Sequence, residues 1–260
     1  MDQKTILGNT EKISLMKKLL ILVGIIIIVI ISALVIGILN LGSIIKSAVN
    51  TYGPQLTQTT VRVEDVNVFL ITGEALLKDF CLGNPEGFTS PEAMAVGTIH
   101  MKMDKASLAN DIIIIDKIEV VRPIITYEKW KGKNNFKAIR DNIKRRSAPG
   151  AHTPEAAAEG AGKKLVIKDF LVKEGKVNIT SAGRAGMKTA SAQLAELHLR
   201  NLGGTTGGTP AEIVEEILRV LSRQAGALAF SELVKQGLRE RSTLRDEVRK
   251  ELESAPEKTR

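Results

Sequence analysis

Residues 19–39 constrain this chain most, because this stretch is uncharged and almost entirely aliphatic. Seventeen of its 21 residues are Leu, Ile or Val. As a helix rising about 1.5 Å per residue, it is roughly 31 Å long, which matches a bilayer hydrocarbon core of about 30 Å. A lone segment in lipid satisfies its backbone hydrogen bonds only as a helix. We therefore expect a transmembrane helix at residues 19–39.

The predicted span is better explained as a retained anchor than as a cleaved signal. A secretory signal has an apolar region of about 7–15 residues and a small-x-small cleavage site, and this run is longer with no clear site after it. Lys12, Lys17 and Lys18 precede the run, whereas only Lys46 follows it closely. The positive-inside rule then places residues 1–18 in the cytoplasm. In a bacterium, this predicts a single-pass inner-membrane protein with most of its chain in the periplasm.

The remaining chain has the composition of a folded domain, with 43% apolar residues and 25% charged residues over the whole sequence. Aromatic residues make up only 3%, which disfavours an outer-membrane barrel with its aromatic girdles. A single cysteine, Cys81, allows no intrachain disulfide. The net charge of +8 suits anionic headgroups, but a solvated basic surface is the better explanation.

Changes in hydrophobic period divide the chain into regions. Residues 40–60 are predicted to form a helical exit from the membrane, ended by Gly53-Pro54, and a linker. Residues 61–146 and 165–205 alternate in hydrophobicity and are predicted to be two β-rich parts of one sheet. Residues 147–164 are rich in Ala, Gly, Pro and Glu and predict a flexible linker, and residues 206–260 predict amphipathic helices.

About eight strands are expected in a meander with few helices between them, which favours an antiparallel sheet. Residues 165–179 are predicted to form a hairpin with Glu174-Gly175 at its turn. Phe136, Ile139 and Ile143 have helical spacing and predict a short helix.

The C-terminal region has its own start signal. Thr209-Pro210-Ala211-Glu212 is a capping box with proline at the first helical position. The helix that it starts is expected to break near Gly226 and again near Gly237.

No motif predicts catalysis. His100, His152 and His198 lack metal-ligand spacing, and the glycine-rich run 203–208 lacks the lysine of a phosphate-binding loop. No nucleophile–base pair and no aromatic-basic nucleic-acid module is recognisable. The sequence therefore predicts a non-enzymatic protein with no cofactor, no metal and no nucleic-acid partner.

The strand pattern itself is the remaining feature. One face of the predicted sheet would be apolar, and it needs cover from a second protein layer, the C-terminal helix or acyl chains. The residues predicted to line this apolar groove are Val61, Val63, Val68, Leu70, Ile112, Ile114, Ile118 and Val120.

Three stretches resemble a known family. Gly53-Pro54-Gln55-Leu56-Thr57 with the following strand, the turn Gly83-Asn84-Pro85-Glu86-Gly87-Phe88, and the strand IEVVRPIITYE (118–128) with Asn134-Asn135-Phe136 are similar to AsmA-like proteins. The segment LVIKDFLVKEGKVNI (165–179) resembles a repeated strand unit of that family. Together with the anchor, the resemblance covers roughly residues 15–205.

This resemblance implies a mainly β fold with α elements: an N-terminal transmembrane helix, a twisted, open, half-barrel-like sheet, and C-terminal amphipathic helices. It implies a periplasmic AsmA-like protein that binds or helps transfer phospholipid in envelope and outer-membrane biogenesis, like the related chorein-type proteins. Eight strands at about 4.8 Å span only about 40 Å, so this chain alone would not bridge an envelope. A structural or assembly factor with a sealed core, acting with an envelope protein or a second copy of itself, is the alternative.

Overall fold

The structure, a computed structural model, describes residues 40–148, 163–183 and 186–254. The span predicted at residues 19–39 and most of the predicted linker 147–164 lie outside these residues. The chain divides into two compact units, residues 1–45 and 46–260, and the second carries the whole sheet. Within the ranges described, no helix has both the length and the apolar character needed to cross a bilayer.

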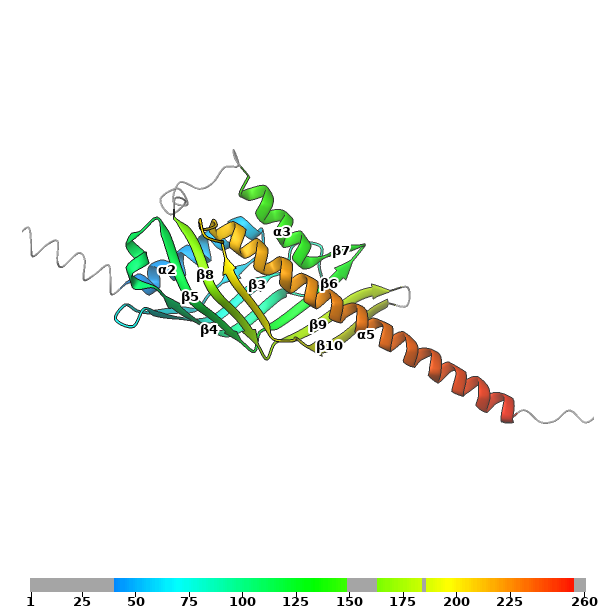
Figure 1. Ribbon diagram of the computed structural model, residues 1–260. Coiled ribbons are helices and arrows are strands. Elements are labelled where there is room, and N and C mark those ends of the chain that lie inside the picture. Colours follow the sequence, from blue (N-terminus) through cyan, green and yellow to red (C-terminus); the bar gives the residue numbers. More distant parts are fainter. Residues whose placement is uncertain (1–39, 149–162, 184–185, 255–260) are drawn as a thin grey trace, which may run out of the picture. The chain divides into compact units, whose positions relative to one another are not determined.

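One large open sheet forms the second unit (Figure 1). The strand order is β10-β9-β6-β4-β5-β8-β11; β3 pairs with β4 and carries β1 and β2, and β7 pairs with β6. The strands are β1 (Val61–Arg62), β2 (Asp65–Phe69), β3 (Glu74–Gly83), β4 (Glu92–Met103), β5 (Ile112–Val121), β6 (Ile124–Trp130), β7 (Lys133–Asn134), β8 (Lys164–Lys173), β9 (Lys176–Gly183), β10 (Gly186–Gln193) and β11 (Leu197–Leu202), with a 3-10 helix η1 (Lys105–Ala109) before β5. The predicted β-rich, open sheet is confirmed.

The strand pairing is mixed, which corrects the expectation of an antiparallel meander. β5 pairs with β8 in parallel, and β6 pairs with β9 in parallel. The hairpin predicted over residues 165–179 is wrong, because β8 and β9 pair with different strands and the chain continues past Glu174-Gly175. Parallel strands need a long crossover, and the chain between β7 and β8 supplies it.

Three α-helices of the described residues accompany the sheet: α2 (Leu41–Thr57), α3 (Asn135–Arg146) and α5 (Pro210–Ser254). The predicted helix at Phe136 is confirmed, and the Asn134 side chain caps it by accepting from Lys137 N–H. The predicted capping box is also present. Thr209 N–H donates to Glu212 Oε2 at 2.8 Å, and Glu212 N–H donates to Thr209 Oγ1 at 3.3 Å.

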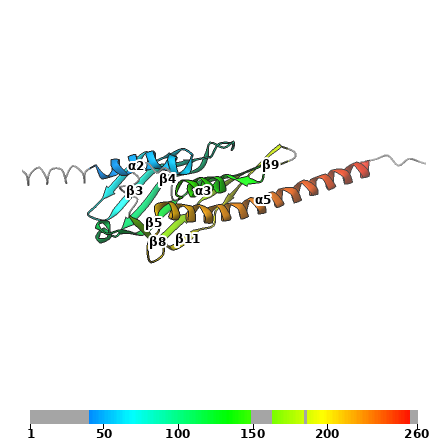
Figure 2. The ribbon, with the colours of Figure 1, turned by 90° about the horizontal axis from the view of Figure 1, so that it is seen from above.

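Helices α3 and α5 lie along one face of the sheet, here called the inner face (Figure 2). Their buried side chains join those of the strands in one hydrophobic core. From α3 these are Phe136, Ile139 and Ile143, and from α5 they are Ile213, Leu218, Leu221, Ala225 and Ala229. The opposite, outer face has no helix over it in Figures 1 and 2.

Two glycine predictions are corrected. Helix α2 continues through Gly53-Pro54 to Thr57, and α5 runs through Gly226 and Gly237 without a break. Gly53 is required for packing, because a Cβ there would lie 2.7 Å from Val61 Cβ. A Cβ at Gly226 would lie 3.3 Å from the Tyr127 hydroxyl oxygen. These two glycines let helix and strand approach closely and do not end the helices.

The strands do not alternate regularly along their length. Several neighbouring strands, or the connections that follow them, contain a pair of consecutive residues that both lie on the outer side. These pairs lie side by side across the sheet, and inward-facing residues flank them. This first break line consists of Lys78–Asp79, Gly97–Thr98, Val121–Arg122, Lys173–Glu174 and Ala195–Glu196. Three of these residues, Asp79, Arg122 and Glu174, have φ between 50° and 53°. Because each strand has an additional residue on the outer side, it bends toward the inner face, as at a β-bulge.

A second break line crosses β5, β8 and β11 at Asp116–Lys117, Lys168–Asp169 and Arg200–Asn201. The pairing of β4 with β5 shifts register there, and Asn201 has φ 53°. Since side chains of a strand alternate between faces, an extra residue reverses which positions face inward. Ile115 and Ile118, three residues apart in β5, therefore both belong to the core.

Glu174 tests the break-line conformation, because it is exposed and its left-handed φ disfavours a branched side chain. We expect Glu174→Val to lower the free energy of unfolding by about 1–2 kcal/mol, and Glu174→Gly to leave it unchanged or raise it. Chemical denaturation of the full chain in detergent measures both. Lys176→Val, at a neighbouring exposed strand position, is the matched control and should cost little. An equal cost for the two valine variants would contradict the interpretation.

Candidate functional site

The eight residues predicted to line a groove do not lie on one open surface. Val63 is 0% exposed, and Asn50 of α2 hydrogen-bonds both its N–H and its C=O. Val61 and Val120 are also buried, and Ile118 packs against the same core as Val120. On these positions the expectation of an apolar surface open to lipid is wrong, because protein already covers them.

The other four predicted groove residues are half-buried and lie elsewhere. Val68 is in β2, and Leu70 follows it in the β2–β3 turn. Ile112 and Ile114 lie on the outer side of β5, because the second break line separates them from Ile118. With Val166 and Lys168 they line a shallow hollow of about 590 Å³.

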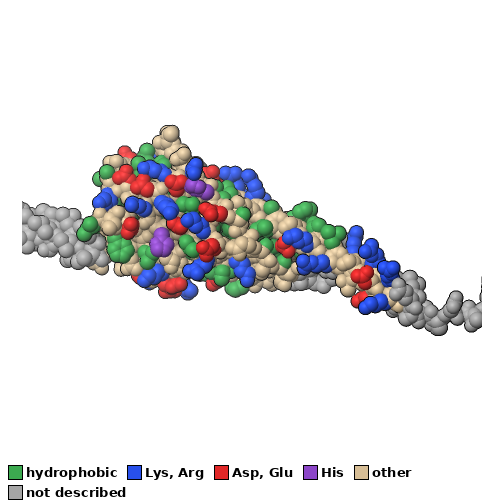
Figure 3. Space-filling view, turned by 60° about the horizontal axis from the view of Figure 1, so that its bottom comes forward, with side chains coloured by type: hydrophobic (Ala, Val, Ile, Leu, Met, Phe, Trp, Pro, Cys, Tyr) green, Lys and Arg blue, Asp and Glu red, His purple; other side chains and the backbone are tan. Residues whose placement is uncertain are grey.

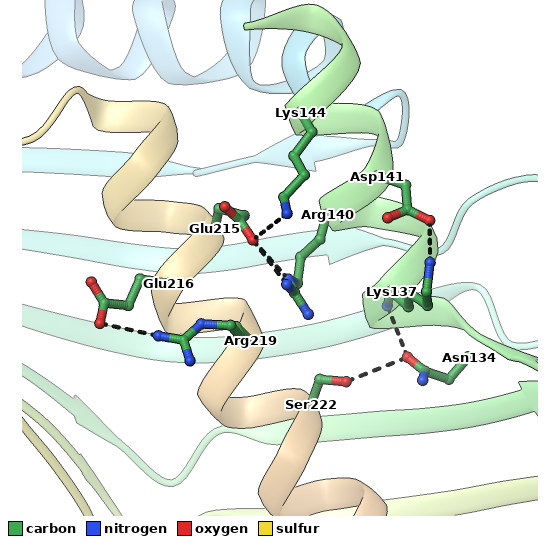
Figure 4. A network of polar contacts seen from close by, with 9 residues as sticks. All are labelled: Asn134, Lys137, Arg140, Asp141, Lys144, Glu215, Glu216, Arg219 and Ser222. Atoms are coloured by element: carbon green, nitrogen blue, oxygen red, sulfur yellow. Dashed lines mark hydrogen bonds and ion pairs between the residues drawn. The ribbon is translucent and has the colours of Figure 1, made fainter. Parts of the chain in front are cut away.

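Ion pairs hold α3 and α5 together over the inner face (Figure 4). Glu215 of α5 lies 2.9 Å from Arg140 Nη2 and 3.4 Å from Lys144 Nζ, both on α3. The hydrogen bond from Arg140 lowers the pKa of the Glu215 carboxyl in spite of partial burial, and Lys144 adds to the effect. The two helices therefore form one connected cover over the sheet.

A buried polar cluster lies at the end of the sheet where β6 meets the loop of residues 84–91. Glu128 is only 1% exposed. Its Oε1 accepts from Thr89 N–H at 2.7 Å and from Thr89 Oγ1 at 2.6 Å, and its Oε2 accepts from Ser90 N–H at 2.8 Å. The carboxylate thus binds the loop through three hydrogen bonds.

Asn135 extends this cluster to α3. It is 0% exposed, and its Oδ1 accepts from Glu128 N–H at 3.1 Å. Its Nδ2 donates to Asn84 Oδ1 and to Thr126 O, both at 2.7 Å. Asn84 in turn donates to Ser90 O. Two of the stretches that carry the family resemblance therefore meet here: the turn 83–88 at Asn84, and the strand 118–128 with its following segment at Glu128 and Asn135.

The ionisation of Glu128 follows from these contacts. Burial raises the pKa of this carboxyl, but the Thr89 hydroxyl and the N–H groups of Thr89 and Ser90 outweigh it, so the pKa lies below its ordinary value of 4.5. The loop therefore binds the charged form. Three hydrogen bonds from one loop to a single buried carboxylate support a structural role for this cluster.

The outer face is polar with both signs of charge. Figure 3, with the bottom of Figure 1 brought forward, shows acidic and basic side chains interspersed with apolar ones. Polar contacts connect neighbouring strands on this face. Lys168 forms an ion pair with Asp116 at 2.7 Å, Lys173 forms one with Glu119 at 2.9 Å, and His198 Nε2 is hydrogen-bonded to Asp169 Oδ1 at 2.6 Å. Exposed pairs of this kind each contribute little to stability, but they keep this face soluble.

Helix α5 presents apolar side chains to solvent. Phe230, Val234 and Leu238 are four residues apart and are 73%, 43% and 62% exposed. At this spacing they form one stripe along the helix. Gln236 donates to Thr189 O of β10. Beyond this contact, residues 238, 239 and 241–247 of the helix are exposed.

Three further candidates from the sequence are a metal site, the Cys81 thiol and the glycine-rich run 203–208. Across the part of the chain that is described, no three His, Cys, Asp or Glu side chains are grouped to hold a metal. Cys81 is a free thiol whose pKa burial and Glu92 raise to about 11. The run 203–208 is a turn before α5, in which Gly208 pairs with Leu165.

No family model matches the chain, and comparisons with curated proteins and with solved structures find no match. The AsmA-like resemblance therefore stays a prediction. The resemblance marks the turn 83–88 and the segments around Glu128 and Asn135 in the sequence, but it predicts no contact between them. A carboxylate that directly follows the apolar residues of a strand, as at Glu128, is the available signal.

Replacing Glu128 with Gln should destabilise the fold by about 2 kcal/mol, because an amide nitrogen faces N–H donors and the charge-assisted bonds are lost. The exposed Glu86→Gln, in the same loop, is the matched control and should change little. Unfolding free energies of the full chain in detergent measure this difference.

The same pair of variants carries a pH test. The folded pKa of Glu128 lies below its unfolded value, so its stabilisation is present above the unfolded pKa and disappears as pH falls through the folded one. The cost of Glu128→Gln should therefore shrink in acid. A cost that stays constant from neutral pH to below pH 4 would contradict this role for the carboxylate.

Proposed function

We propose that this chain is a non-catalytic, membrane-anchored structural or assembly factor of the bacterial cell envelope, with its β domain in the periplasm. The observation that carries the proposal is the cover over the inner face. Ile118, Val120 and Phe170 of the sheet share one core with Leu218 and Leu221 of α5. A lipid would have to displace these helix side chains to reach that face.

The free energy needed to displace α5 from the inner face supports an assembly role more than lipid binding at that face. Fully burying a Leu or Ile side chain contributes about 1.5–3 kcal/mol, and α5 alone buries Ile213, Leu218 and Leu221. Removing α5 would also break the ion pairs of Glu215 with α3. Acyl chains would have to compensate for both losses.

Partner binding is the activity that the exposed part of α5 supports. A contiguous apolar stripe on a soluble surface marks an interaction site. Phe230, Val234 and Leu238 would dock against an apolar helix of a partner protein in the envelope. The sealed domain then acts as a rigid support that holds this helix at the membrane.

Lipid binding remains a second candidate, now at a different place. Ile112, Ile114 and Val166 give the outer hollow apolar walls, and Lys168 supplies a cation beside them. This chemistry would suit an acyl chain with an anionic headgroup, although Lys168 already pairs with Asp116 at 2.7 Å.

Site-specific photo-crosslinking tests the proposed docking stripe. We expect the full chain with p-benzoylphenylalanine at Leu238 to give one discrete protein adduct in its native membranes, because this position lies within the stripe. The matched control places the same group at Arg239, which is exposed but lies about 100° around the helix. The second variant, Phe230→Ser, should abolish the Leu238 adduct without changing thermal stability.

The adducts separate the possible partners. A product of twice the mass of the chain identifies a second copy, and any other discrete mass identifies a different envelope protein. Equal, diffuse labelling from Leu238 and Arg239, or labelling that survives Phe230→Ser, would contradict a docking stripe on α5.

A further inference from the structure

The most exposed large apolar side chain among the described residues, Ile71, lies at the turn between β2 and β3. Ile71 is 90% exposed and Phe69 is 52% exposed. With the half-buried Leu70 they form a run of three apolar residues, here called the hairpin tip. Soluble turns are ordinarily polar, so this composition needs an apolar or interfacial neighbour.

The hairpin tip is held in place by hydrogen bonds. Gly73 N–H donates to Phe69 O at 2.8 Å, and Lys105 Nζ donates to Ile71 O at 2.6 Å. Gly73 has φ 74°, and a Cβ there would lie 2.7 Å from Met103 O. Two carbonyls of the tip are therefore satisfied by the protein, which lowers the cost of placing this backbone against lipid.

The hairpin tip points toward the end of the domain at which the chain enters. Gly53 packs on Val61, Asn50 binds Val63, and Lys46 Nζ donates to Glu64 O. Residues 61–64 thus run antiparallel to α2, toward its residue 46. β1 and β2 both pair antiparallel with β3, so β2 keeps this direction. The five residues from Glu64 to Phe69 extend about 17 Å further.

The length of chain before the domain brings the membrane within reach of the tip. The predicted span ends at residue 39, and Lys46 is seven residues later. Residues 41–46 belong to α2, so these seven residues cover only about 10 Å. Exposed Lys102 and Lys105 lie beside the turn, where they would face anionic headgroups.

We propose that Phe69, Leu70 and Ile71 insert into the outer leaflet boundary of the bilayer that anchors the chain. The inference rests on the membrane anchor of the proposed function. It gives the domain a second attachment point, which fixes its orientation on the membrane surface. The outer hollow at Ile112 lies at the same end of the sheet, because Met103 of β4 and Ile115 of β5 pair there.

Fluorescence of a membrane-sensitive label tests this insertion. The full chain with Cys81→Ser receives one NBD label at Ile71→Cys and is reconstituted in vesicles of phosphatidylethanolamine and phosphatidylglycerol. We expect blue-shifted emission and at least two-fold quenching by nitroxide-labelled phospholipid. The control label at Glu86→Cys lies beyond the other end of β3 and should show neither.

A Phe69→Asp substitution in the Ile71→Cys chain should return its label to water-like emission, while alkaline carbonate extraction leaves the chain in the membrane. Water-like emission at Ile71→Cys without that substitution overturns the proposal, and so does a blue shift without nitroxide quenching, which means that protein covers the tip. A chain released by carbonate lacks the anchor itself, so that result overturns the proposed function separately.

Discussion

Burial of the inner face beneath α3 and α5 is the interaction on which the rest of this structure depends. An open sheet whose strands carry Val, Ile, Leu and Met on one side is unstable in water until that side is covered. Here Phe136, Ile139, Leu218 and Leu221 provide the cover. These helix side chains occupy the apolar surface of the inner face. The same contacts hold α5 in place while its opposite side faces solvent.

The buried cluster explains how one end of this sheet stays ordered. Glu128 binds the loop at Thr89 and Ser90, and Asn135 connects β6 to Asn84 and α3. An unpaired carboxylate at 1% exposure would be costly, so the loop and the strand each depend on the other. The resembling turn 83–88 and the resembling strand 118–128 with its following segment 134–136 therefore serve one packing arrangement.

The sequence predicted the elements better than their connections. Local signals were sufficient for the α3 helix at Phe136 and for the capping box at Thr209, because short-range hydrogen bonds and spacing decide them. The parallel pairing of β8 with β5 depends on a crossover through α3, which no local pattern encodes. Gly226 looked like a helix break, yet its role is to accommodate Tyr127 from another element.

The prediction that Ile112, Ile114, Ile118 and Val120 share one face is wrong because the alternation in β5 is interrupted. Strict alternation places Ile112, Ile114, Ile118 and Val120 on one face, but the doublet Asp116–Lys117 interrupts it. Similar doublets recur as Lys78–Asp79, Lys168–Asp169 and Lys173–Glu174. Two adjacent charged residues inside an apolar strand are therefore one sequence signal for a break line, although Gly97–Thr98 and Val121–Arg122 carry no such doublet. With these doublets counted, the inner and outer residues of β5 could have been separated.

The most direct test of a sealed inner face is photolabelling with a phospholipid that carries a diazirine in its acyl chain. The full chain in vesicles is irradiated, and labelled peptides are mapped by mass spectrometry. We expect no label on Ile118, Val120 or Phe170, because helix side chains occupy that space. Label on these three residues would show that lipid enters beneath α5 and would contradict the sealed core.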